Sequence, residues 1–174
     1  MKVYNFNRDL AAKVHEDANH RYDKDGKNHP YIYHLDMVVE VARKFKHLIP
    51  EKNYFHVETG LYFHDSIEDA RLTYNDVKKL TNSIIAAEIA YALTNEKGKT
   101  RKDRANDKYY EDIRNTEYAI FGKVCDRIAN MLYGKQEGSS MLQTYIKEYP
   151  HFKEKLYDEQ YKEMFDYIEN EFIK

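Results

Sequence analysis

Apolar residues recur at helical spacing along most of the chain. In the first eighteen residues they fall on every fourth position, at Phe6, Leu10, Val14 and Ala18. The segment 37–48 carries a stripe of the same period. No segment alternates between apolar and polar residues for long enough to predict a sheet. The pattern therefore predicts an all-α fold.

Turn-forming and capping residues divide this pattern into separate helices. Pro30 suits the first turn of the second helix, and Pro150 is expected to break the helix that contains it. Asn82 or Ser83 is expected to cap a helix that ends near Thr94. Helices are predicted over about residues 5–22, 30–47, 51–69, 73–80, 83–94, 101–112, 116–134 and 139–149, and from Pro150 to the C-terminus, with loops at 23–29 and 95–103. A length of 174 residues fits one domain, residues 1–174.

Composition narrows the classes of partner. Apolar residues make up 42% and charged residues 33% of the chain, which is typical of a globular protein. The net charge of −2 lacks the basic excess of a nucleic-acid-binding protein, so no nucleic acid is expected as a partner. A small phosphorylated ligand needs only a local cluster of Lys and Arg.

The sequence also bears on the compartment. A single cysteine, Cys125, excludes a disulfide within the chain, and a reducing compartment is the default. The first residues lack the apolar core of a signal peptide, and no apolar run approaches the roughly 20 residues that span a bilayer. We therefore expect a cytoplasmic protein without a membrane partner. The 17 tyrosines suit core and interface packing and are compatible with a homo-oligomer.

The segment HDSIED, residues 64–69, is the first candidate for chemistry. A lone His-Asp pair arises easily by chance and is common on solvated helix faces. On a helix, however, His64 shares a face with Glu68, and Asp65 shares a face with Asp69. Three carboxylates so close together repel one another unless a positive charge lies between them. A divalent cation is the simplest such charge.

Two other apolar helices supply further ligands. His34 follows one turn into the second predicted helix, and Asp126 lies in the apolar run VCDRIA. Taken singly, His34 could be a hydrogen-bonded core histidine, and Asp126 could form a buried salt bridge with Arg127 or another arginine. Their occurrence together with His64 and Asp65 favours a metal site. Imidazole and carboxylate ligands suit Mn²⁺, Fe²⁺, Zn²⁺ or Co²⁺.

Three ordered stretches carry a resemblance to a known family. The first runs from His20 to the PYIYH segment at 30–34 and is similar to a pattern of A-H, about ten residues, then P-Y-I-x-H. The second, HDSIED, matches H-D-x-x-E-D. The third, KVCDRIAN at 123–130, matches K-x-x-D-[RK]-x-x-N. Over about residues 5–170 the chain resembles the HD superfamily of metal-dependent phosphohydrolases. Within it, the chain is most similar to the hydrolase domain of RelA/SpoT proteins and the small alarmone hydrolases.

The resemblance implies a fold and an activity. The fold is a single HD-domain helical bundle. The activity is removal of pyrophosphate from the 3′ position of a guanosine alarmone, (p)ppGpp, with Mn²⁺ as the expected ion. The implied metal ligands are His34, His64, Asp65 and Asp126.

The resemblance also implies the roles of residues around the metal. Glu68 and Asp69 are the implied acid pair that orients and deprotonates the attacking water. Lys24, Asn130 and Tyr145 are the implied contacts to the nucleotide.

The basic segment near residue 101 offers groups that could hold phosphates. Its members are Arg101, Lys102, Arg104 and Lys108, of which Arg104 and Lys108 share a face if the segment is one helix. The alternative is that these residues form a solvated basic loop without a binding role. Among them, Arg104 is the residue most expected to bind phosphate even then.

Departures from the family pattern leave two other functions open. Residues 22–25 read YDKD where the family often has G-Q-x-R, and Leu35 follows His34 where the family has proline. The same site could therefore hydrolyse another phosphorylated nucleotide, such as a nucleoside monophosphate or NADPH. A metal-binding or nucleotide-binding regulator without turnover is less favoured, because it has no need of both Glu68 and Asp69.

Overall fold

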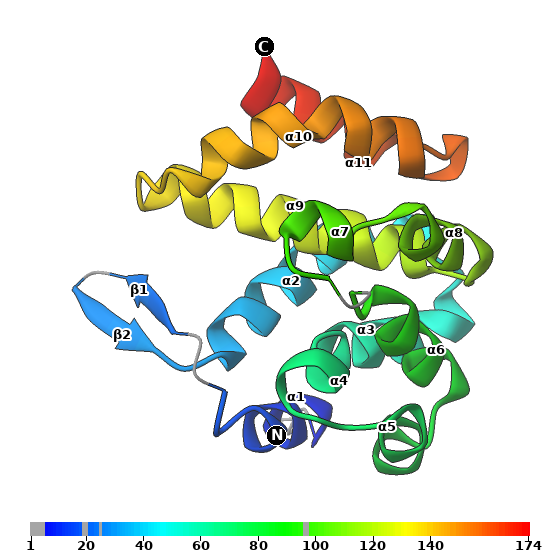
Figure 1. Cartoon of the computed structure of the whole chain (residues 1–174). Coiled ribbons are helices and arrows are strands. Elements are labelled where there is room, and N and C mark those ends of the chain that lie inside the picture. The colour runs from blue at the N-terminus through cyan, green and yellow to red at the C-terminus, as the bar shows by residue number, and fades with distance from the viewer. Residues whose placement is uncertain (1–5, 19–20, 25, 96–97) are drawn as a thin grey trace.

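The computed structural model describes residues 6–18, 21–24, 26–95 and 98–174. Within these ranges the chain forms helices joined by short turns, together with one small hairpin (Figure 1). The α-helices are α1 (Phe6–Val14), α2 (Ile32–Lys44), α3 (Glu51–Phe63), α4 (Ser66–Asp69), α5 (Tyr74–Thr81), α6 (Ile84–Leu93), α7 (Arg101–Arg104), α8 (Asp107–Asn115), α9 (Ala119–Gln136), α10 (Met141–Leu156) and α11 (Lys162–Ile168). None of the described helices is long and apolar enough to cross a membrane.

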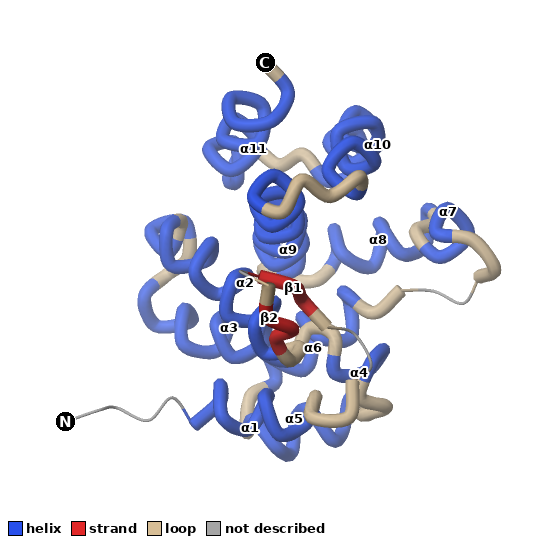
Figure 2. The backbone as a smooth tube through the Cα atoms, turned by 90° about the vertical axis from the view of Figure 1, so that its left-hand side faces the viewer, coloured by secondary structure: helices blue, strands red, loops and turns tan. Residues whose placement is uncertain are grey.

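Helix α9 lies at the centre of the bundle. It packs against α2, α3, α6 and α8 and also against α10 and α11. Figures 1 and 2 show α10 and α11 as a layer over α9, with α1 and α5 at the far end of the molecule. This arrangement places the middle of α9 beside α2 and the end of α3.

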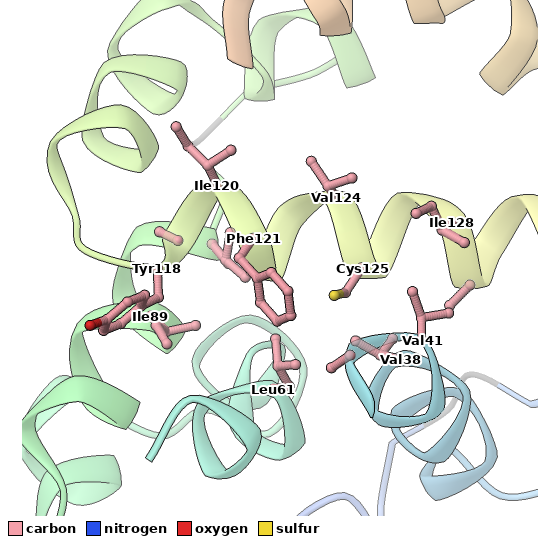
Figure 3. Close-up of a cluster of buried hydrophobic side chains, with 14 of the residues drawn as sticks. Val38, Val41, Leu61, Ile89, Tyr118, Ile120, Phe121, Val124, Cys125 and Ile128 are labelled. Carbon is pink, nitrogen blue, oxygen red and sulfur yellow. The ribbon is translucent and has the colours of Figure 1, made fainter. Parts of the chain in front are cut away.

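The core explains why α2, α3 and α9 meet. Phe121, Cys125 and Ile128 of α9 are fully buried at helical spacing. In Figure 3, Phe121 and Cys125 point toward Leu61 of α3 and Val38 of α2. Burial of each such apolar side chain contributes about 1.5–3 kcal/mol, so the core fixes the relative positions of the three helices.

A glycine permits the close approach of α9 to this layer. A Cβ at Gly122 would lie 3.1 Å from Cδ2 of Leu61 and 3.2 Å from Cδ1 of Leu93, which is closer than ordinary contact. A side chain at position 122 would therefore require Leu61 and Leu93 to shift by a few tenths of an ångström. The approach brings Asp126, one turn further along α9, next to α3.

Capping residues mark the ends of α5 and α6, and Ser83 is one of the two caps predicted for the helix that ends near Thr94. Thr73 caps α5 through a reciprocal capping box with Asp76. Asn82 ends α5 in the left-handed conformation, with φ of 51°. Ser83 caps α6, because its hydroxyl accepts a hydrogen bond from the amide of Ala86 at 3.1 Å.

The first predicted helix and loop are wrong in detail. Helix α1 ends at Val14 rather than near residue 22, and an antiparallel hairpin of β1 (Tyr22–Lys24) and β2 (Lys27–His29) replaces the predicted loop. Gly26 turns the hairpin with φ of 70°, a conformation that favours glycine. Tyr22 is buried against the rings of His34 and Tyr133, and this tertiary packing outweighs the helical spacing.

The predicted helix 51–69 is interrupted at His64 and Asp65, between α3 and α4. The backbone of Asp65 has φ of −98° and ψ of 0°, between α3 and α4. The hydroxyl of Ser66 donates a hydrogen bond to the carbonyl of Phe63 at 2.7 Å, in competition with the helix ladder.

Helix boundaries in the second half of the chain also differ from the prediction. Two helices, α7 and α8, replace the single helix 101–112, because the extended residue Asn106 caps α8 through the amide of Tyr109. Pro150 does not break α10, which continues to Leu156. Asp158 caps a 3-10 turn (Glu159–Tyr161) that precedes α11, and a π-helical turn (Glu169–Ile173) follows α11.

Candidate active site

Three side chains from three helices meet beside the centre of α9. They are His34 of α2, His64 at the C-terminal end of α3, and Asp126 of α9, and one ligand atom of each lies within 4.8 Å of the others. Both histidines are buried, with 2% of each exposed. Within the part of the chain that the structure describes, these three side chains form a group that could hold a metal ion.

Asp65 lies against the same group. Its Oδ2 is 2.9 Å from Nε2 of His64 and 3.7 Å from Nε2 of His34. Oδ1 of Asp126 is 3.4 Å from Nε2 of His34. The structure thus brings together all four predicted ligands, from segments up to 92 residues apart in the sequence (126 − 34).

The orientation of His64 fits a metal better than a hydrogen bond. Its Nδ1 lies 2.8 Å from the carbonyl oxygen of Leu61, which favours a proton on Nδ1 and leaves a lone pair on Nε2. That Nε2 is buried without a hydrogen-bond partner among the described residues, although it faces the carboxylates of Asp65 and Asp126. A cation shared by the imidazole and the carboxylates would satisfy all of them.

Neighbouring polar groups fix the two carboxylates. The hydroxyl of Tyr31 donates to Oδ2 of Asp65 at 2.6 Å. The amide of Asn130 donates to Oδ1 of Asp126 at 2.6 Å, and the ammonium of Lys123 donates to Oδ2 at 2.9 Å. Such contacts hold ligand side chains in place around metals.

The electrostatics of the group favour positive charge at its centre. Burial opposes protonation of His64, but Asp65 and Asp126 outweigh burial and raise the pKa of the imidazole to about 9, so that a proton on Nε2 and a metal ion compete for the same position. Burial likewise opposes ionisation of Asp126, but Lys123 and the two histidines hold its pKa well below the ordinary value. The carboxylates are therefore ionised and attract a cation.

Glu68 and Asp69 lie on α4, directly after the cluster. Both side chains are exposed, and with Asp17 and Arg71 they line a cavity of about 680 Å³. The carboxylate of Glu68 accepts hydrogen bonds from the backbone amide and the side-chain amide of Asn95, at 3.2 and 2.9 Å. The amide of Asp69 donates to the carbonyl of Asp65 at 2.8 Å, as expected for residues four apart on a helix.

A basic cavity of about 640 Å³ adjoins the cluster on the side of α7 and α10. Its charged lining consists of Arg101, Arg104, Lys123, Arg127 and Glu148. Lys123 connects the cavity to the cluster, because its ammonium contacts Asp126. Phosphate groups are the natural ligands of such a lining.

Only some of the residues predicted to hold phosphates line the basic cavity. Arg104 lines the basic cavity, but it does not share a helix with Lys108, which lies on α8 and pairs with Asp112. The expectation of a shared helix face is therefore wrong, because Asn106 starts a new helix between them. The side chain of Lys102 lies outside the part of the chain that the structure describes.

The predicted nucleotide contacts are spread over the molecule. Tyr145 lies beside the basic cavity, where the guanidinium groups of Arg101 and Arg127 contact its ring at 5.2 and 4.6 Å from the centroid. Lys24 instead lines a different cavity, of about 590 Å³, with Tyr33 and Tyr133. The structure therefore does not bring Lys24 to the basic cavity. A role of Asn130 toward a nucleoside remains a prediction, since its amide is bonded to Asp126.

A buried histidine near the site is not among the residues singled out from the sequence. His15 is buried, its Nδ1 lies 2.9 Å from the carbonyl oxygen of Ala11, and its ring stacks on Tyr31 at 5.2 Å. The signal in the sequence was its spacing from Ala11 and Ala18, which are also buried. His20, the histidine matched to the A-H pattern, lies outside the described residues.

Comparison with known proteins bears on the fold. No family model matches the sequence, and no curated protein is significantly similar to it. A solved structure does match, and its report describes a metazoan orthologue of SpoT that hydrolyses ppGpp and plays a role in starvation responses. The superposition has a TM-score of 0.68 and covers 98% of this chain and 96% of that chain, at 18% sequence identity. The helical fold expected from the resemblance is therefore confirmed.

Proposed function

We propose that this chain is a metal-dependent phosphohydrolase that removes pyrophosphate from the 3′ position of ppGpp, with GDP as the other product. One observation carries the proposal: ligand atoms of His34, His64 and Asp126 lie within 4.8 Å of one another, and Asp65 lies against them. The likeness of the fold to that of a ppGpp-hydrolysing protein supports the substrate. Mn²⁺ is the expected ion.

The surrounding side chains divide the chemistry between them. His34, His64, Asp65 and Asp126 would hold a divalent cation, which would supply Lewis acidity for activating water and positive charge toward a phosphoryl group. Glu68 and Asp69 are proposed to orient the attacking water and accept its proton. Arg104 and its basic neighbours are proposed to hold the phosphates that are not attacked.

Contacts to the nucleoside are assigned to the polar and aromatic groups nearest the cluster. Asn130 and Tyr145 lie beside Asp126 and the basic cavity, respectively. Lys24 is proposed to contact the nucleotide from the hairpin, on the side of Tyr33 and Tyr133.

The direct experiment is an assay with Mn²⁺ and ppGpp. We expect release of GDP and pyrophosphate in equal amounts, and loss of that release in Asp126→Asn. Absence of product at high enzyme concentration would refute the substrate.

Replacing Glu68 with alanine separates the proposed catalyst from the proposed ligands. Because a general base contributes about 10²–10⁴-fold, Glu68→Ala should lower kcat by at least about 100-fold and leave Mn²⁺ bound. Glu111→Ala removes an exposed carboxylate on α8 and serves as the control. Loss of Mn²⁺ from Glu68→Ala would instead make Glu68 a ligand.

The hairpin favours one alternative substrate class. Residues 22–24 form a strand whose Asp23 carbonyl accepts a hydrogen bond from Tyr133 at 2.8 Å, and this segment departs from the G-Q-x-R pattern. A different nucleotide, such as a nucleoside monophosphate or NADPH, is therefore the second candidate. A panel of phosphorylated nucleotides, assayed for released phosphate and pyrophosphate, ranks it against ppGpp.

A further inference from the structure

The basic cavity contains an acid among its arginines. The carboxylate of Glu148, on α10, accepts hydrogen bonds from Nε and Nη2 of Arg101 at 2.8 and 3.2 Å. It also accepts one from Nη1 of Arg127 at 3.1 Å. Glu148 thus lies where a phosphate group would accept hydrogen bonds from the same two guanidinium groups.

The two arginines differ in their freedom to change partners. The side chain of Arg127 is only 8% exposed and lies against the rings of Tyr145 and Phe152, each centroid 4.6 Å away. A cation so buried requires a permanent partner. The side chain of Arg101 is 49% exposed and belongs to the short helix α7, so it can exchange Glu148 for a ligand at low cost.

The remaining cations of the cavity set the local balance of charge. Lys123 is paired with Asp126. Arg104 makes no ion pair with residues that the structure describes. Arg104 is therefore available to a ligand at once, whereas Arg101 is available only against competition from Glu148.

We infer that Glu148 is a specificity-determining residue: it competes with phosphate-bearing ligands for Arg101 and repels them, and its effect increases with the charge of the ligand. The repulsion between Glu148 and a bound anion is proportional to the anion's charge. Glu148 therefore limits how tightly the cavity retains a pyrophosphate group. The inference rests on the proposed function in taking this cavity as the place where phosphates bind.

Binding of inorganic pyrophosphate and inorganic phosphate to the full chain tests the inference. In low-salt buffer, Glu148→Gln should bind pyrophosphate about tenfold more tightly than wild type and phosphate about threefold more tightly. The gain should shrink as ionic strength rises. Glu154→Gln on the same helix removes a carboxylate that is 71% exposed, and it should bind both anions as wild type does.

The opposite result has a clear meaning. If Glu148 mainly positioned α7 and its arginines, Glu148→Gln would bind pyrophosphate more weakly than wild type, and the inference would be overturned. A gain of equal size for both anions would overturn it as well. Glutamine keeps an acceptor oxygen for Arg127, and thermal melting checks that the variant folds.

A second variant keeps the inference testable if Glu148→Gln does not fold. Arg101→Gln removes the exposed cation for which ligand and Glu148 compete, so pyrophosphate affinity should fall at least about fivefold. If the affinity of Arg101→Gln for pyrophosphate were unchanged, Arg101 would not be the cation for which Glu148 and the ligand compete, and the inference would be contradicted. All these readouts are binding constants, so they remain informative even if ppGpp is not hydrolysed.

Discussion

At the scale of single residues, the carboxylate of Asp65 depends on a phenol outside the cluster. The hydroxyl of Tyr31 donates to Oδ2 of Asp65, and the ring of Tyr31 is held by stacking on His15. Tyr31 itself is buried. The orientation of a proposed ligand is thus set by residues that do not touch the cation.

We predict that Tyr31→Phe weakens Mn²⁺ binding by about 10-fold while leaving the fold intact, because loss of a partner around a metal ligand typically costs 10–100-fold in affinity. Titration of the purified variant with Mn²⁺, followed calorimetrically, measures the change. Tyr33→Phe, in the first turn of α2 and beside the hairpin, is the matched control. Equal affinities for Tyr31→Phe and wild type would show that Asp65 needs no such support.

Residue types and spacing were enough to predict which side chains form the cluster. Burying His34 or Asp126 in an apolar helix is costly, so each had to have a partner, and the partner was found in HDSIED. The surroundings were not predictable in the same way. Lys123 rather than an arginine pairs with Asp126, although their spacing of three residues on one helix makes this contact readable in the sequence. His15 reaches Tyr31 through a contact between separate segments, and such contacts leave no periodic signal.

At the scale of elements, helix α10 shows how tertiary packing overrides a local rule. Pro150 lacks the amide hydrogen of the helix ladder and was expected to end the helix. The buried side chains of Tyr149, Phe152 and Leu156 flank it and hold both halves of α10 in the core. The helix therefore continues through the proline.

Replacing Pro150 should stabilise the protein. Pro150→Ala restores an amide donor and removes the clash of the ring with the preceding turn. We expect the free energy of unfolding to rise by about 1–2 kcal/mol, after allowance for the greater freedom of the unfolded chain. Urea denaturation measures it, with Lys147→Ala, an exposed position on α10, as control. A destabilised variant would mean that the proline ring itself contributes packing.

Elements with strong apolar periodicity were predicted well, as α2, α5, α6 and α9 show, and side-chain caps also mark the starts of α5 and α6. Apart from α10, which tertiary packing carries through Pro150, the elements predicted wrongly are short or lie next to the site. The strands of the hairpin have three residues each, too few for an alternating pattern, and the break at Asp65 follows from local competition for the carbonyl of Phe63.

At the scale of the whole molecule, the packing of α2 and α3 against α9 makes a site from distant segments. The apolar contacts in Figure 3 bring the three helices together. A similar arrangement over nearly the full length of a chain that is only 18% identical indicates that the apolar pattern, more than residue identity, determines this fold.

The central claim is that His34, His64, Asp65 and Asp126 hold one divalent cation, and equilibrium binding of Mn²⁺ tests it most directly. Wild type should bind one Mn²⁺ per chain at the site. The affinity of Asp126→Asn for Mn²⁺ should fall by more than about 100-fold, because mutating even a residue that hydrogen-bonds to a metal ligand typically lowers metal affinity by 10–100-fold. Asp112→Asn, which removes a half-exposed carboxylate on α8, should bind as wild type does. If Asp126→Asn binds Mn²⁺ with wild-type affinity and stoichiometry, the four side chains do not form the metal site.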